Sequence, residues 1–134
     1  GSEEHQINEE YVDEEIFDIS TKKINSLPLL IKNINLFKAY NIVPIVRESS
    51  IAAKNWKTQV SMVFIDGSHS LDSAMQDFES WNTKIISGGA LVIHDIYENP
   101  EEGGQAPYHV YKYALQNGFI DFERVDTIVC MKKL

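Results

Sequence analysis

Cysteine, long apolar runs and basic residues near the start of the chain are all scarce, and each shortage excludes a class of protein. Cys130 is the only cysteine, so no internal disulfide can form, and its apolar neighbours indicate a small core residue. A reducing compartment fits this, and we expect the cytoplasm. No apolar run approaches the roughly 20 residues that a membrane-spanning helix needs, and no secretory signal is visible, so we expect no membrane partner.

Lysine and arginine are absent from residues 1–18, which hold eight of the 20 acidic residues. The other 12 acidic residues are balanced by 12 basic ones, so the rest of the chain is neutral. A nucleic-acid surface needs a basic stripe, and we therefore expect no nucleic-acid partner. An acidic run is usually a solvated segment. We predict an acidic, flexible segment over residues 1–20 and one folded domain over residues 21–134.

The apolar pattern predicts helices and strands that alternate along the chain. Helices are expected at 26–41, 49–56, 70–86 and 107–116, and strands at 42–46, 60–65, 90–93, 119–125 and 127–131. Gly88 and Gly89 are expected to stop the third helix. Alternation of this kind is typical of an α/β, Rossmann-like fold, with a mostly parallel sheet and helices on both faces. The last strand is expected to pair antiparallel with the one before it.

Polar clusters follow three of the predicted strands. The first is 47–50, the second is 66–69, and the third is His94 with Asp95. In open α/β sheets, ligands bind beyond the carboxyl ends of the strands. Any one cluster alone is more simply a turn or a helix cap, but three in succession favour a functional site. We expect the carboxyl groups of Asp66 and Asp95 to face one groove at the ends of neighbouring parallel strands.

The order and spacing of four motifs resemble those of one family, the class I S-adenosylmethionine-dependent methyltransferases. The motifs are Ile65-Asp66-Gly67 with His69, then Asp77 with Trp81, then Gly88-Gly89, then His94-Asp95. The resemblance implies a seven-stranded sheet whose seventh strand is antiparallel, of which the strands predicted here are the third to the seventh. The family's Gly-rich G-x-G loop is not found before residue 42. We therefore expect the first two strands to be lacking and the chain to be truncated, with weak or no activity.

The resemblance also implies roles for particular residues. The family reaction would be methyl transfer to an oxygen of a small-molecule acceptor. Glu48 and Ser49 would lie near the adenosine of S-adenosylmethionine, whereas Asp66, Gly67 and Ser68 would approach its methionine end. Asp66 and Asp95 occupy the places that hold a divalent cation, such as Mg²⁺, in related O-methyltransferases.

Two histidines and two tyrosines have alternative interpretations. His69 or His94 could be the general base of a catalytic set with Asp66, or His69 could cap a helix and His94 could be a packed strand-end residue. Tyr108 and Tyr111 could contact the acceptor substrate, although an amphipathic helix explains them nearly as well. Asp77 could orient the loop at 67–69.

Two rival functions remain open. The first is a non-catalytic binding or assembly module, in which the open edge of the strand at 42–46 pairs with a second copy to form a homodimer. Pro44 would block this edge only in part. The second is a metal-dependent hydrolase that uses Asp66, His69 and Asp95.

Overall fold

The computed structural model describes residues 17–18, 23–67 and 70–134, and the chain forms two compact units, Gly1–Val46 and Arg47–Leu134. In the first unit, β1 (Phe17–Asp18) pairs antiparallel with β2 (Lys23–Ile24), and α2 (Leu27–Leu36) follows with a proline in its first turn. The predicted flexible segment falls mostly outside the described residues, so it stays a prediction. None of the helices in the described ranges is long and apolar enough to cross a membrane.

The strand predicted at 42–46 is wrong, because these residues have no strand structure. An apolar run becomes a strand only when a neighbouring strand supplies hydrogen-bond partners. Within the described part of the chain, no strand pairs with this segment. Pro44 also lacks an amide donor, which weakens any ladder that could form here.

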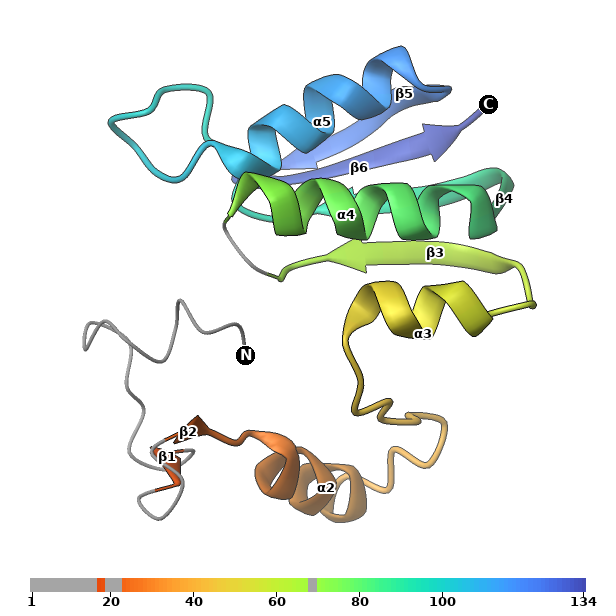
Figure 1. Ribbon diagram of the computed structural model, residues 1–134, viewed down its shortest axis with the longest axis vertical. Coiled ribbons are helices and arrows are strands. Elements are labelled where there is room, and N and C mark those ends of the chain that lie inside the picture. The colour runs from red at the N-terminus through yellow and green to blue at the C-terminus, as the bar shows by residue number, and fades with distance from the viewer. Residues whose placement is uncertain (1–16, 19–22, 68–69) are drawn as a thin grey trace. The chain divides into compact units, whose positions relative to one another are not determined.

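The second unit contains a four-stranded sheet in the order β3-β4-β6-β5 (Figure 1). Its strands are β3 (Val60–Ile65), β4 (Ile85–Ile93), β5 (Phe119–Val125) and β6 (Ile128–Lys133). β3 and β4 are parallel, whereas β6 is antiparallel to both β4 and β5. Asp126 makes the tight turn between β5 and β6 with a φ of 53°. The predicted α/β class and the antiparallel last strand are confirmed.

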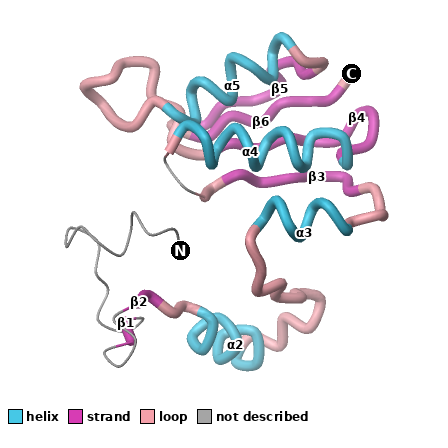
Figure 2. Tube along the Cα trace, viewed as in Figure 1, coloured by secondary structure: helices cyan, strands magenta, loops and turns pink. Residues whose placement is uncertain are grey.

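Three helices belong to this unit: α3 (Ser49–Asn55), α4 (Leu71–Trp81) and α5 (Ala106–Gln116). Phe78 of α4 and Val110 of α5 are buried in the same core as Ile93 of β4, so both helices cover one face of the sheet (Figure 2). α3 packs beside α4. The opposite face includes Met62 and Phe64 and carries no helix of residues 47–134. The expected helix layers on both faces are therefore not found within this unit.

Gly88 and Gly89 lie inside β4 and do not stop a helix as predicted. α4 ends at Trp81, a short 3-10 turn (Asn82–Lys84) follows, and β4 begins at Ile85. The register between β3 and β4 shifts here. A Cβ atom on Gly89 would lie 2.9 Å from the carbonyl oxygen of Ser61, so only glycine fits where the two strands approach.

Candidate functional site

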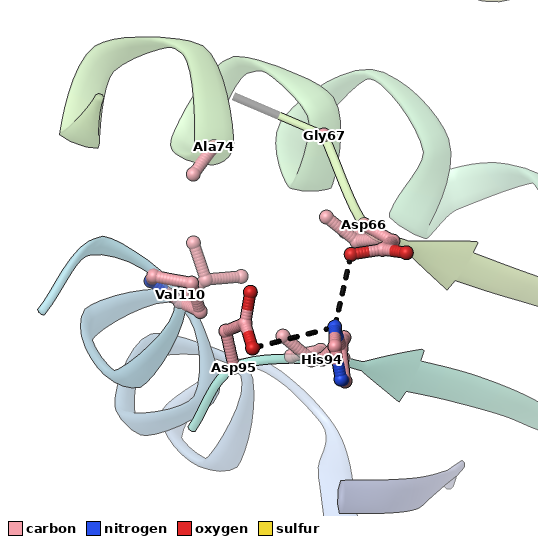
Figure 3. A pocket seen from close by; sticks show the side chains of 9 residues that line it. Asp66, Gly67, Ala74, His94, Asp95 and Val110 are labelled. Carbon is pink, nitrogen blue, oxygen red and sulfur yellow. Dashed lines mark hydrogen bonds and ion pairs between the residues drawn. The ribbon is translucent and has the colours of Figure 1, made fainter. Parts of the chain in front are cut away.

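The ends of β3 and β4 bring three polar side chains together. Ile65 and Ile93 are partners in the parallel ladder, so the next residues of both strands emerge side by side. His94 Nδ1 lies 3.1 Å from Asp66 Oδ1 and 3.4 Å from Asp95 Oδ1 (Figure 3). The carboxyl groups of Asp66 and Asp95 therefore lie in one place, as expected from the strand order.

Asp95 has an unusual backbone conformation. Its φ of 60° lies in the left-handed region, where residues other than glycine are uncommon. The next residue, Ile96, is buried, and its amide donates to the carbonyl of Thr127 over 2.9 Å. Tertiary packing therefore holds the chain in this turn. Strained residues of this kind often cluster at functional sites.

A small hollow joins the polar cluster to an apolar floor. Asp66, Gly67, His94 and Asp95 form its polar side, and its apolar side is formed by Ile65, Ala74, Ile93, Pro107 and Val110. The sequence prediction used Pro107 as the start of a helix and did not name Val110. They lie three residues apart at the start of α5, so the spacing of the helix that follows the site loop could have identified them.

The cluster has a donor set that suits a divalent cation. One ligand atom from each of Asp66, His94 and Asp95 lies within 4.8 Å of the others. Ligands that share a Mg²⁺ ion are at most about 4.2 Å apart, because each bond is about 2.1 Å long. Side-chain movements of a few tenths of an ångström would bring the oxygens of Asp66 and Asp95 within that separation, so these two carboxylates could share such an ion.

The cluster can also transfer a proton. With the proton on Nδ1, His94 donates a hydrogen bond to the Asp66 carboxylate. The other ring nitrogen, Nε2, is then free of its proton and can accept one from a bound hydroxyl group. The ring packs near Phe64, with centroids 6.5 Å apart. The contact with Asp66 therefore orients the His94 ring and favours the tautomer with its proton on Nδ1.

The predicted cofactor residues Glu48 and Ser49, at the start of α3, make hydrogen bonds with other side chains of the protein. The Ser49 Oγ accepts a hydrogen bond of 2.9 Å from Trp81 Nε1 and donates one to the Asp77 carboxyl group. Glu48 is exposed and accepts a hydrogen bond from Ser50 Oγ. Ser49 therefore binds other side chains of the protein. The predicted contacts of Ser68 and His69 lie outside the described residues.

The two predicted substrate tyrosines do not line the hollow. Tyr108 and Tyr111 stack on each other with ring centroids 6.0 Å apart. The Tyr111 hydroxyl donates to Asp121 Oδ2 over 3.0 Å. Burial, and then the hydrogen bond and negative charge of Asp121, raise the pKa of Tyr111. Neither tyrosine is among the residues that line the hollow, and their substrate role stays a prediction.

A family model described as a methyltransferase domain matches residues 7–96. The match covers more than half of the chain and includes Asp66, His94 and Asp95. The chain belongs to this methyltransferase family. The predicted resemblance is thereby confirmed, and the match begins upstream of the motifs that carried it. It also makes methyl transfer the general activity of the domain.

Two solved structures share the fold of this methyltransferase. One is a Streptococcus mutans protein described as a methyltransferase, in complex with S-adenosylhomocysteine; the TM-score is 0.59 at 14% identity, over 81% of this chain and 70% of that one. The other is described as an rRNA methylase from Clostridium thermocellum; the TM-score is 0.51 at 17% identity, over 77% and 67%. At these identities the likeness shows the fold alone.

Proposed function

We propose that this methyltransferase moves a methyl group from S-adenosylmethionine to an oxygen of a small-molecule acceptor, at the cluster of Asp66, His94 and Asp95. The observation that carries the proposal is the contact of His94 Nδ1 with the Asp66 carboxylate. The S-adenosylhomocysteine bound by the Streptococcus mutans protein supports the choice of cofactor. The side chain of Asp66 is 50% exposed, so its negative charge is available to the positive methionine end of that cofactor.

The reaction needs one bond to form and one to break. The acceptor oxygen attacks the methyl carbon, and the carbon–sulfur bond breaks with its electron pair going to sulfur, which leaves S-adenosylhomocysteine. His94 Nε2 takes the proton of the acceptor hydroxyl, and Asp66 stabilises the imidazolium that results. Asp66 and Asp95 would hold a divalent cation such as Mg²⁺, which supplies a lower pKa for the acceptor hydroxyl. Glu48 and Gly67 would contact the adenosine and methionine parts of the cofactor.

The test follows S-adenosylhomocysteine release by mass spectrometry, with the full chain, S-adenosylmethionine and a panel of phenols as oxygen acceptors. Amines of matching size serve as the comparison. We expect weak turnover with the phenols, as the missing Gly-rich loop implies, and a further fall of roughly 10²- to 10⁴-fold for His94→Gln. His109→Gln is the matched control, because His109 is an exposed histidine of α5 outside the cluster, and we expect it to act like the unmodified chain.

Three results would contradict parts of the proposal. Calorimetry that detects no binding of S-adenosylhomocysteine would exclude the cofactor. Equal turnover for His94→Gln and His109→Gln would exclude His94 as the base. Turnover that does not change when EDTA removes divalent cations, or when Asp95→Asn replaces a ligand, would exclude the cation.

Self-association is a second candidate function. Among the described strands, β3 pairs with β4 on one side only, so its other edge offers unpaired backbone groups. We propose that two copies of the chain pair along this edge of β3. The sequence had predicted pairing through a strand at 42–46, which is not formed. Light scattering over a range of concentrations tests it. A dimer at high concentration is expected, and a monomer throughout would exclude the pairing.

A further inference from the structure

A chain of polar contacts joins α3 and α4. Trp81 Nε1 donates to Ser49 Oγ over 2.9 Å, and the Ser49 hydroxyl donates to the carboxyl group of Asp77. Asp77 and Trp81 are one turn apart on α4, so they reach Ser49 from the same side of that helix. The hydroxyl group of Ser49 both accepts and donates here, and the contact fixes the direction of the Asp77 side chain.

The Asp77 carboxyl group also approaches Gly67. A Cβ atom on Gly67 would lie 3.2 Å from Asp77 Oδ2, which is closer than ordinary contact. Gly67 is not among the residues with positive φ, so its backbone conformation does not call for glycine. The Asp77 carboxyl group would therefore have to shift to admit a side chain at this position.

The position of Gly67 matters because it follows Asp66 directly. Any shift of the backbone at Gly67 turns the Asp66 side chain, whose Oδ1 lies 3.1 Å from His94 Nδ1. Further along the chain, the Ser70 side chain caps α4 by accepting from the amide of Ser73.

Asp77 is also a costly residue at this place. Burial raises the pKa of its carboxyl group, although the hydrogen bond from Ser49 acts in the opposite direction. A charged side chain in a partly buried site is destabilised by the loss of water. Stability alone therefore does not explain a carboxyl group here, and a role in the site is a better explanation.

We propose that Asp77, held by Ser49, is a positioning residue that braces Gly67 and thereby orients Asp66 toward His94. The inference rests on the proposed function, since it gives Asp66 and His94 their parts in methyl transfer. The Ser49 side chain then acts on the site through Asp77. The brace also links the start of α3 to the end of β3, the two places that the family resemblance assigns to the cofactor.

A double-mutant cycle tests the brace in the full chain. Gly67→Ala adds a methyl group against the carboxyl group, and we expect kcat to fall on the order of 10- to 100-fold with little change in KM. In the Asp77→Ala background the space is open, so the added Gly67→Ala should cause less than a further twofold loss. Asp77→Asn keeps the volume and an acceptor for Ser49, and should restore most of the activity that Asp77→Ala loses.

A second readout separates this inference from the proposed function. The imidazole nitrogen shifts of His94, recorded by NMR at one pH without cofactor, should move in Asp77→Ala and stay in place in Asp77→Asn and in the control Glu79→Gln. Glu79 is an exposed acid on the same helix. If the protein transfers no methyl group under any condition, the proposed function is wrong. The His94 nitrogen shifts would still test whether Asp77 positions Asp66.

Two outcomes would overturn the brace. One is a folded Asp77→Ala variant with unchanged His94 shifts. The other is an equal loss of kcat from Gly67→Ala with and without the Asp77 carboxyl group. Should Asp77→Ala fail to fold, Ser49→Ala removes the hydrogen bond but keeps the carboxyl group, and the same shift of the His94 signals is expected.

Discussion

The left-handed conformation of Asp95 allows backbone strain to be separated from the loss of its carboxyl group. Asp95→Gly and Asp95→Ala both remove the carboxyl group, so their difference reports the backbone alone. With φ at 60°, an alanine costs about 1–2 kcal/mol, which glycine avoids. Glycine itself lowers the free energy of unfolding by about 0.4–1 kcal/mol, because it leaves the unfolded chain more conformational freedom. We therefore expect the glycine variant to be the more stable by about 1 kcal/mol.

Urea denaturation of the full chain measures this difference as a shift in midpoint at constant slope. Gln76 gives the matched control, because it is exposed in the middle of α4. There the order should reverse, with Gln76→Ala more stable than Gln76→Gly by about 1 kcal/mol. An Asp95→Ala variant as stable as Asp95→Gly would refute the argument from strain. Both Asp95 variants are expected to lose cation-assisted methyl transfer.

Three further predictions concern packing and ionisation. Gly89→Ala should lower the free energy of unfolding by about 1–3 kcal/mol, because its Cβ would meet backbone oxygens that cannot rotate away; an unchanged urea midpoint would contradict this. The pKa of Asp77 is raised above its usual 3.8, so ionising this carboxyl group costs more in the folded chain than in the unfolded one. The contribution of Asp77 to the free energy of unfolding is therefore highest below pH 3.8 and falls as the pH rises through the raised pKa. The stability of Asp77→Asn relative to the unmodified chain should therefore increase from acid to neutral pH, and a gap independent of pH would count against it. Asp121→Asn should bring the pKa of Tyr111 down toward 10.0, measured by NMR of labelled tyrosine; no change would show that Asp121 does not raise it.

The site was the most predictable part of the molecule. Asp66 and His94 each follow an apolar run, and parallel strands end at the same edge of a sheet. Only the direction and adjacency of β3 and β4 were needed to bring these residues together, and both follow from the helix between them. The distance of 3.1 Å between them required the register, in which Ile65 faces Ile93.

The errors fell where local pattern and long-range pairing disagree. The run at 42–46 has the composition of a strand, but within the described residues no partner strand pairs with it. Gly88 and Gly89 are common helix stops, yet the backbone of Ser61 approaches Gly89 from a neighbouring strand. The polar contacts of Ser49 were also not predicted, because its partner Trp81 is 32 residues away in the sequence.

The sequence by itself determined the order of the helices and strands in residues 47–134 and which polar residues stand at the strand ends, because burial on one face leaves a periodic apolar pattern. It also carried the motifs that mark the family. Only the tertiary structure decided that both α4 and α5 cover one face of the sheet, that Ser49 turns toward Asp77, and that Asp95 takes a left-handed turn. These depend on contacts between residues far apart in the chain, which a local pattern does not encode.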